Sequence, residues 1–274
     1  MIVSDLDGSL LNKQHQVDQK IIDVVKQVID KEIVFVVATG RPLYPGHHHL
    51  DFEPYPVYRI SKNGAQVHDP HFKTLYEETY TLEELESILT ELNDLHFHMI
   101  GDQETWIFGD RETFVDNNYH FNIKTQAYYK EISPLEREAI LERKIFVTDV
   151  KQALKEKVYK INCHIKDETK KKELDAFLDK HPTLINTPFK PGFYEIVPNR
   201  INKANAIEFL AKQLHIKHDE IVVFGDGNND LEMLKRFRSY APISGTKEAQ
   251  LMADEVIGHY HDYAVILKIK ELID

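Results

Sequence analysis

Two aspartates near the start of the chain set the strongest limit on its fold. Asp5 and Asp7 follow the short apolar segment Met1–Val3, and Gly8 then breaks the chain. If Ile2–Asp5 is a buried strand, both carboxylates lie near its carboxyl end, where open α/β sheets bind their ligands. Two carboxylates held this close repel each other unless a cation or a proton separates them. The segment therefore indicates a parallel sheet with an acidic site at one edge.

A second acidic segment near residue 226 repeats this arrangement. It reads Gly225-Asp226-Gly227-Asn228-Asn229-Asp230, follows the apolar segment Ile221–Phe224 and precedes an expected helix at Leu231–Phe237. Each acidic segment alone would also suit an ordinary polar turn. Because parallel strands end at one edge of a sheet, however, both segments are expected to meet there. Two further polar segments are placed to join this edge: Thr39-Gly40-Arg41, after the apolar run Ile33–Ala38, and Lys203, at the start of an amphipathic helix.

The order Asp-x-Asp-Gly, Thr-Gly-Arg, Lys and Gly-Asp-x-x-Asn-Asp resembles the motif set of the haloacid dehalogenase-like phosphatase superfamily. The stretch Ile60-x-x-Asn63-Gly64-Ala65 is similar to the Cof-type branch, which carries a large α/β cap. The resemblance spans the whole chain. It implies an α/β fold, with a Rossmann-like core built on a parallel sheet and an inserted α+β cap domain.

The middle of the chain differs in composition from both ends. Residues from about 81 to 189 are rich in Lys, Glu, Tyr and His and contain none of the motifs. We therefore expect a catalytic core of residues 1–80 and 190–274, and a cap of residues 81–189 that determines substrate specificity. The strand Tyr194–Val197 is expected to return to the core. Within the cap, helices are expected near 133–142 and 167–180.

The resemblance also implies a role for each motif residue. Asp5 would be the nucleophile that forms an aspartyl-phosphate. Asp7 would protonate the leaving alkoxide and then deprotonate the attacking water. The implied catalytic residues are Asp5, Asp7, Thr39 and Lys203. The implied phosphate-binding residues are Gly8, Thr39, Gly40, Arg41, Asn63, Lys203 and Asn229, and the implied metal-binding residues are Asp5, Asp7 (through its backbone carbonyl), Asp226, Asn229 and Asp230.

Charge explains why such a site would need a metal ion. A carboxylate ~4 Å from a phosphate charge faces a repulsion of ~4 kcal/mol at an effective dielectric constant near 20. A bridging divalent cation cancels this repulsion, and Mg²⁺ prefers hard oxygen ligands such as carboxylates and carbonyls. Mg²⁺ is therefore the expected cofactor. Arg41 is expected to pair with the substrate or with an acid of the cap.

The overall composition limits the classes of molecule that this protein is expected to bind. A formal net charge of −11 argues against nucleic acid or an anionic membrane as a partner. The single cysteine, Cys163, lies in an alternating strand-like run and is expected in the core, so neither an internal disulfide nor a Cys-based zinc site is expected. The longest apolar run, Ile33–Ala38, has six residues, against the ~20 of a membrane helix. We expect a cytoplasmic monomer or weak homodimer that acts on a small phosphorylated metabolite.

Some conspicuous residues receive no role. His47–His49 and Lys170–Lys172 suit solvated helix faces, and Trp106 suits the core of the cap. His15 follows the first motif and lies near the expected site, but it is not assigned a function.

The sequence also departs from the family pattern at three places. Ser9 replaces the usual threonine and keeps a hydroxyl group. The segments Ile243-Ser244-Gly245 and His261-Asp262-Tyr263 lack the usual residues of two loops that flank the site in the family. Because the catalytic groups are intact, we expect these two altered loops to affect which substrate is used more than which reaction is catalysed.

Three functions are compatible with the motifs. The first is a Mg²⁺-dependent phosphatase for sugar phosphates or phosphorylated cofactors. The second is a phosphotransferase or phosphomutase on the same scaffold, which must keep water away from the aspartyl-phosphate. The third is a metal- or phosphate-binding sensor without catalysis. The presence together of five charged motif residues argues against the third function: Asp5, Asp7, Lys203, Asp226 and Asp230.

Overall fold

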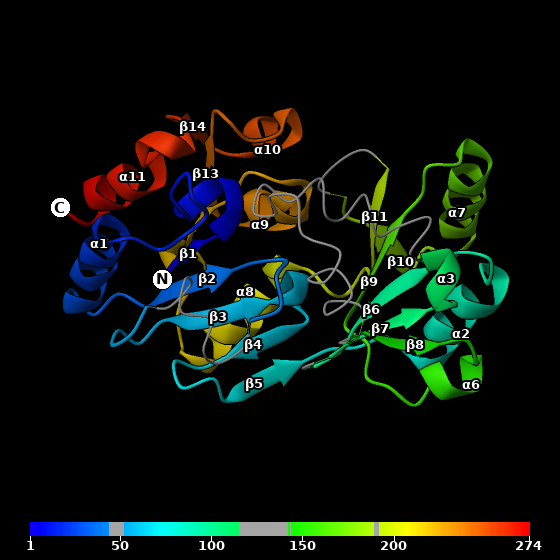
Figure 1. Cartoon of the computed structure of the whole chain (residues 1–274). Coiled ribbons are helices and arrows are strands. Elements are labelled where there is room, and N and C mark those ends of the chain that lie inside the picture. The colour runs from blue at the N-terminus through cyan, green and yellow to red at the C-terminus, as the bar shows by residue number, and fades with distance from the viewer. Residues whose placement is uncertain (44–51, 103, 115–141, 143, 189–191) are drawn as a thin grey trace. The chain divides into compact units, whose positions relative to one another are not determined.

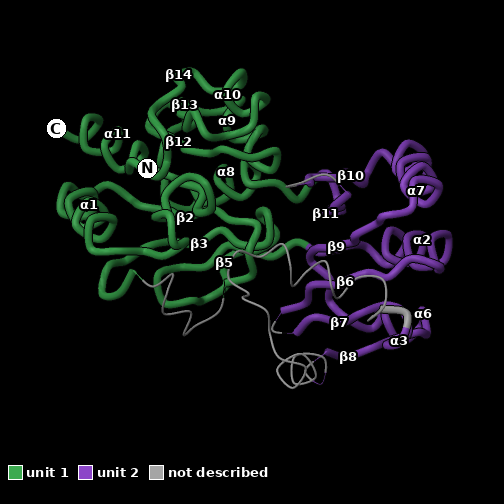
Figure 2. The backbone as a smooth tube through the Cα atoms, turned by 45° about the horizontal axis from the view of Figure 1, so that its top comes forward, with its two compact units in different colours: residues 1–78, 200–274 green, residues 79–199 purple. Residues whose placement is uncertain are grey.

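A computed structural model describes residues 1–43, 52–102, 104–114, 142, 144–188 and 192–274. The described chain divides into two compact units (Figure 2). Unit 1 comprises Met1–Glu78 and Arg200–Asp274, and unit 2 comprises Thr79–Asn199. Among the described residues, every helix is too short or too polar to span a membrane. The run His47–His49 and, apart from residue 142, the helix expected near 133–142 lie outside the described residues.

Unit 1 contains one mixed sheet with helices on both faces (Figure 1). Its described strands are β1 (Ile2–Ser4), β2 (Phe35–Ala38), β3 (Tyr58–Ser61), β4 (Gln66–His68), β5 (Thr74–Glu77), β12 (Val222–Phe224), β13 (Arg238–Pro242) and β14 (Glu255–Ile257). Its described helices are α1 (Gln19–Asp30), α8 (Lys203–Gln213), α9 (Leu231–Arg236), α10 (Lys247–Met252) and α11 (Ala264–Ile273). The strand order is β14-β13-β12-β1-β2-β3-β4-β5. The pairs from β14 to β3 are parallel, and β3, β4 and β5 pair antiparallel.

Each face of this sheet has its own hydrophobic core. On one face α1 and α11 pack through residues such as Val25 and Val265 against Phe35. On the other face α8, α9 and α10 pack through residues such as Ile207 and Met233 against the sheet. The central strands are buried throughout, as expected for parallel strands covered on both sides.

The strand order brings the predicted motifs to one edge. β1 lies between β12 and β2, and Ser4 is in register with Phe224 on one side and with Val37 on the other. The chain passes from β1 to β2 on one side and reaches β12 on the other side much later. The end of β1 is therefore a topological switch point, where open α/β sheets bind ligands. Asp5 lies directly at this point.

Unit 2 contains a second sheet. Its described strands are β6 (Phe97–Ile100), β7 (Thr105–Phe108), β8 (Ile145–Val147), β9 (Lys160–His164), β10 (Leu184–Asn186) and β11 (Phe193–Pro198), in the order β10-β11-β9-β6-β7-β8. Its described helices are α2 (Leu82–Glu91), α3 (Arg111–Phe114), α6 (Val150–Ala153) and α7 (Glu168–Lys180). A core that includes Leu89, Phe177, Cys163 and Ile196 joins α2 and α7 to the sheet. Cys163 is buried, as its position in the sequence predicts.

One strand lies in a different sheet from the one predicted. The segment Tyr194–Val197, expected in the core, belongs to β11, where Ile196 pairs with Ile161 and Val197 with Ile185. An apolar strand of this kind suits either sheet, and only its pairing partners decide between them. The chain consequently returns to unit 1 at Arg200 rather than near residue 190.

A left-handed turn follows β3 and fixes the position of α8. Lys62, Asn63 and Gly64 all have positive φ angles, of 52°, 61° and 102°. A β-carbon on Gly64 would lie 2.3 Å from the backbone oxygen of Asn202, the residue that caps α8. Only glycine combines this conformation with such a close approach, so Gly64 allows the start of α8 to pack against the turn.

We expect Gly64→Ala to lower the free energy of unfolding by about 1–3 kcal/mol, because alanine is strained at positive φ and would also displace Asn202. Gly258→Ala is the matched control, since a β-carbon there would meet only Ala264 at 3.4 Å. Denaturant unfolding of both variants measures the difference. Equal losses in the two variants would contradict this role of Gly64.

Candidate active site

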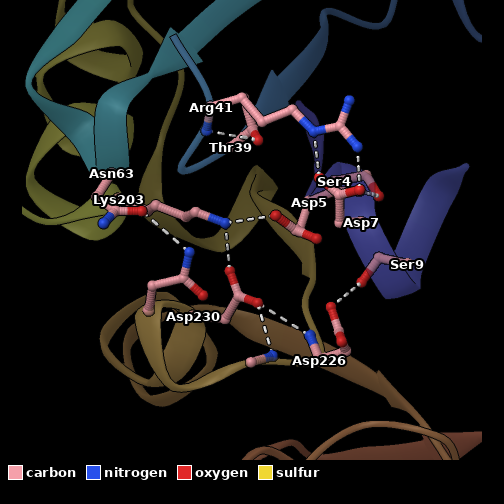
Figure 3. Close-up of polar contacts among 12 residues, drawn as sticks. Ser4, Asp5, Asp7, Ser9, Thr39, Arg41, Asn63, Lys203, Asp226 and Asp230 are labelled. Carbon is pink, nitrogen blue, oxygen red and sulfur yellow. Dashed lines mark hydrogen bonds and ion pairs between the residues drawn. The ribbon is translucent and has the colours of Figure 1, made fainter. Parts of the chain in front are cut away.

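Lys203 stands at the centre of the polar edge of unit 1 (Figure 3). Its side chain is fully buried, and its Nζ donates hydrogen bonds of 2.6 Å to Asp5 Oδ1 and of 2.6 Å to Asp230 Oδ1. Asp5 follows β1, Lys203 begins α8, and Asp230 ends the turn before α9. One ammonium group therefore joins three segments that are distant in the sequence. Losing one member of such a buried group leaves an uncompensated charge, which is strongly destabilising.

The loop after β12 is closed by its own hydrogen bonds. The backbone N–H groups of Asp226 and Gly227 donate to Asp230 Oδ2, at 3.0 and 2.9 Å. The Ser9 hydroxyl donates to Asp226 Oδ1 at 3.1 Å. Ser9 thus supplies the hydroxyl for which threonine is usual, and the loop holds the Asp226 carboxylate beside the helical turn that follows β1.

Three carboxylates in this group suit a divalent cation. Asp5, Asp226 and Asp230 each offer an oxygen, and these oxygens lie within 4.8 Å of one another. The Lys203 ammonium balances only one of the three charges. Carboxylate oxygens are ligands that Mg²⁺ prefers, usually with several waters retained. The residues present therefore fit a Mg²⁺ ion.

The charges in the group also shift its protonation. Burial raises the pKa of Asp5 well above its ordinary value, an effect opposed by Lys203 and reinforced by Asp230 and Asp226. Burial and the neighbouring Asp230 charge raise the pKa of Asp226 to about 7. Burial alone would lower the pKa of Lys203, but Asp230 and Asp5 raise it above its ordinary value. Lys203 is therefore a permanent cation, whereas Asp5 and Asp226 favour a proton or a metal ion.

Asp7 points away from this group and is held by Arg41 (Figure 3). Arg41 Nε donates to Asp7 Oδ2 at 2.6 Å, and Arg41 Nη2 donates to Asp7 Oδ1. His15 Nδ1 lies 3.1 Å from Asp7 Oδ1. Asp7, the acid that pairs with Arg41 among the described residues, belongs to unit 1. The two residues meet because Arg41 follows β2 directly beside the end of β1.

The remaining predicted phosphate-binding residues form a hydrogen-bonded chain. Thr39 Oγ1 accepts from the Arg41 N–H at 3.1 Å, and Thr39 O accepts from the Asn63 N–H at 3.0 Å. Asn229 Nδ2 donates to Asn63 Oδ1 at 3.0 Å, and a β-carbon on Gly40 would lie 2.6 Å from that oxygen. These five residues therefore lie together. The left-handed conformation of Asn63 brings its amide between Gly40 and Asn229.

Gly8 and the loop before Thr246 contact Asp226, and the second unusual segment, at Tyr263, is anchored separately. Gly8 has a φ of +78°, and a β-carbon there would lie 2.2 Å from Asp226 Oδ2. The Thr246 N–H, next to the unusual segment Ile243-Ser244-Gly245, donates to Asp226 O at 2.8 Å. At the other unusual segment Tyr263 adopts a left-handed conformation, with φ of +59°. Its hydroxyl donates to Asp18 Oδ2, which anchors a conformation that glycine would adopt more easily.

Comparison with known proteins decides the family. The family model for haloacid dehalogenase-like hydrolases matches residues 2–269. The chain belongs to this family. Among curated relatives, a Serratia proteamaculans HMP-PP phosphatase is 25% identical, with 95% of this chain and 90% of the relative covered. A Bacillus subtilis 5-amino-6-(5-phospho-D-ribitylamino)uracil phosphatase is also 25% identical, with 85% and 84% covered.

Solved structures of haloacid dehalogenase-like hydrolases share the fold. One from B. subtilis has a TM-score of 0.77 at 22% identity, with 99% of both chains covered. The subclass IIB sugar phosphatase BT4131 has a TM-score of 0.75 at 18% identity, with 100% of this chain and 99% of that chain covered. The predicted α/β fold with a cap, the Cof-type resemblance and the assignment to a family of phosphoric monoester hydrolases are confirmed.

Three contacts in this site were not anticipated from the sequence: the Asn63–Asn229 bond, the Arg41–Asp7 pair and the His15–Asp7 contact. The first two join loops that follow different strands, whereas His15 and Asp7 both lie between β1 and α1. The geometry of all three depends on local backbone conformations that motif spacing does not encode. The one sequence signal for the positive φ of Asn63 is the dipeptide Asn63-Gly64, because Asn-Gly commonly marks turns of this kind.

We expect the metal-free protein to become less stable as the pH rises from about 4 to about 7, with a smaller slope in Asp226→Asn. The folded chain keeps a proton on Asp226 up to about pH 7, whereas the unfolded chain loses it near 3.8. Since the folded state binds more protons in this interval, its stability falls as the pH increases. Denaturant unfolding in excess chelator measures the slopes, and parallel curves for the two proteins would contradict the shift.

Proposed function

We propose that this haloacid dehalogenase-like hydrolase is a Mg²⁺-dependent phosphatase that hydrolyses small phosphorylated metabolites through an aspartyl-phosphate on Asp5. One observation carries the proposal: the buried Lys203 ammonium bonds to Asp5 and Asp230, whose carboxylates cluster with Asp226 at the end of a central parallel strand. Such a cluster offers a nucleophile, a metal site and a fixed positive charge within a few ångströms.

Asp5, Asp226 and Asp230 would hold Mg²⁺ through their side chains, and the Asp7 backbone carbonyl and Asn229 would be further oxygen donors. The ion would neutralise charge shared between the Asp5 carboxylate and the substrate phosphate. Lys203 adds a positive charge that needs no proton transfer, and as a point charge it suits a phosphate oxygen. Thr39 and the backbone N–H groups that follow it would bind the remaining phosphate oxygens.

The reaction then divides between two aspartates. An Asp5 oxygen attacks phosphorus while the bond from phosphorus to the leaving oxygen breaks, and a proton passes from Asp7 to that oxygen. Asp7 next takes a proton from water, which attacks the aspartyl-phosphate and releases inorganic phosphate. Asp7 suits this role because it is partly exposed, unlike Asp5, and stands apart from the buried carboxylates.

Unit 2 would select the leaving group. The motif residues of unit 1 engage the phosphate and the metal, which all phosphate esters share, so they cannot discriminate between alcohols. We assign unit 1 as the catalytic core and unit 2 as the cap that distinguishes substrates. Each contact made or missed with the leaving group changes relative rates by about 10–200-fold.

Release of free phosphate across a panel of phosphorylated metabolites with Mg²⁺ tests the proposed function. The panel should include sugar phosphates, HMP-PP and 5-amino-6-(5-phospho-D-ribitylamino)uracil, the last two being the substrates named for the curated relatives. We expect phosphate release from several members. An isomerised ester without free phosphate would indicate a phosphomutase, and binding of phosphate or metal without turnover would indicate a sensor.

We expect Asp5→Asn to lower turnover by about 10³-fold or more, because the amide keeps the volume but is a poor nucleophile. Asp7→Asn should lose about 10²–10⁴-fold through the acid–base step and keep its Mg²⁺ affinity, since only its backbone carbonyl would bind the metal. Steady-state kinetics and a Mg²⁺ titration separate the two. Near wild-type turnover in Asp5→Asn would exclude the covalent route.

We expect Mg²⁺ to stabilise the wild type by about 2.7 kcal/mol at a hundredfold excess over its Kd. Asp226→Asn should lose most of this gain, because it removes one carboxylate of the cluster. Asp219→Asn is the control, since Asp219 is exposed and lies outside the cluster. Thermal unfolding with and without Mg²⁺ measures the stabilisation of each variant. Equal stabilisation of Asp226→Asn and Asp219→Asn by Mg²⁺ would mean that the ion binds outside the carboxylate cluster.

A further inference from the structure

The function of Asp7 depends on how its carboxylate is held, and two elements hold it. Arg41 donates from the loop after β2 with both Nε and Nη2. His15 approaches from the loop between β1 and α1, with Nδ1 3.1 Å from Asp7 Oδ1. We propose that His15 is a positioning residue that aims the Asp7 carboxyl for proton transfer to the leaving group. This inference rests on the proposed function.

The loop that carries His15 is built by one asparagine. Asn12 Oδ1 accepts from the N–H groups of Gln14 and Gln16, at 2.9 and 3.0 Å. The His15 N–H donates to Asn12 O at 2.8 Å, and the Asn12 N–H donates to Gln16 O at 3.2 Å. His15 itself has a φ of +57°, which is uncommon for a residue other than glycine. A tight, hydrogen-bonded turn therefore fixes the backbone from which the imidazole reaches Asp7.

Hydrogen bonds through Asp18 connect the His15 loop to two helices, α1 and α11. Asn12 Nδ2 donates to Asp18 Oδ2 at 3.1 Å, and Asp18 caps α1 by accepting from the Lys20 and Ile21 N–H groups. The Tyr263 hydroxyl, at the start of α11, donates to the same Asp18 oxygen. The unusual Tyr263 thus contributes to the support of the His15 loop, which links a departure from the family pattern to the position of Asp7.

His15 and Arg41 restrain the Asp7 carboxylate in different ways. When the proton leaves Asp7 for the leaving oxygen, a carboxylate forms that accepts hydrogen bonds from Arg41 and from His15 Nδ1–H. Because Arg41 donates to both oxygens, it fixes the plane of the carboxylate. His15 contacts Oδ1 and adds a further hydrogen bond to the two from Arg41, so that loss of His15 leaves the carboxylate held less firmly within that plane. The effect should fall on proton transfer to the leaving group.

The leaving group offers a direct test. An alkyl phosphate needs a proton on its leaving oxygen, whereas p-nitrophenyl phosphate leaves readily as an anion. We expect His15→Gly to lower kcat/KM for the alkyl ester that the panel finds best by about tenfold to hundredfold, a part of the 10²–10⁴-fold effect of general acid catalysis. For p-nitrophenyl phosphate the change should stay below about threefold, since this ester draws little on general acid catalysis.

Two further variants distinguish the effect of losing the imidazole from the effect of changing the backbone conformation. Glycine removes the imidazole and relieves the positive φ, so backbone strain cannot cause the loss in His15→Gly. His15→Asn should recover most of the activity towards the alkyl ester, because asparagine tolerates this conformation and its side-chain N–H can replace Nδ1–H. His215→Gly is the matched control, as His215 has a φ of 56° and follows α8. It should leave both esters unchanged.

Equal losses on the two esters, or no loss on the alkyl ester, would overturn the positioning role while leaving the proposed phosphatase intact. Failure of the wild type to hydrolyse either ester would overturn the proposed function and the positioning role with it. A readout without turnover is also available, because the His15 imidazole ¹⁵N resonances should shift in Asp7→Asn and not in Asp219→Asn. Unchanged resonances in Asp7→Asn would contradict the contact.

Discussion

The buried Lys203 ammonium is the interaction on which the rest of unit 1 depends. Its bonds to Asp5 and Asp230 join the end of β1, the start of α8 and the loop before α9. An ammonium buried without partners would be costly, and so would the two carboxylates without the ammonium. The fold can therefore bury these groups only if all three segments meet at one point, and that point is the switch between β12, β1 and β2.

The conformation of the surrounding loops follows from the same constraint. Several residues other than glycine take positive φ angles near the site or in loops that support it, among them His15, Lys62, Asn63 and Tyr263. Each such residue costs of the order of 1–3 kcal/mol and persists only where neighbouring contacts outweigh it. Here those contacts are hydrogen bonds: Asn63 accepts from Asn229, Tyr263 donates to Asp18, and His15 donates its N–H to Asn12. The strained backbone conformations thus occur in the loops that orient side chains at the site.

Much of this arrangement could be predicted from the sequence, because motif spacing and strand ends are local signals. Asp5, Asp226 and Asp230 were expected to meet, and their carboxylates lie within 4.8 Å. The assignment of Tyr194–Val197 to the core was wrong, because an apolar strand carries no mark of the sheet it joins. The pairing of Arg41 with Asp7 and the contact of His15 with Asp7 were not predicted, because both depend on loop conformations that motif spacing does not encode. The His15 loop, for example, is held through Asn12 and Asp18 by a hydrogen bond from the distant Tyr263.

The central claim is that the group around Lys203 transfers a phosphoryl group to Asp5. Rapid acid quenching of the enzyme during turnover with Mg²⁺, followed by borohydride reduction, tests it most directly, because reduction converts an aspartyl-phosphate to homoserine. Mass spectrometry of the digested protein should then find homoserine at position 5 and at none of the other site aspartates. Homoserine at position 7, 226 or 230, or its absence throughout under steady turnover, would contradict the account.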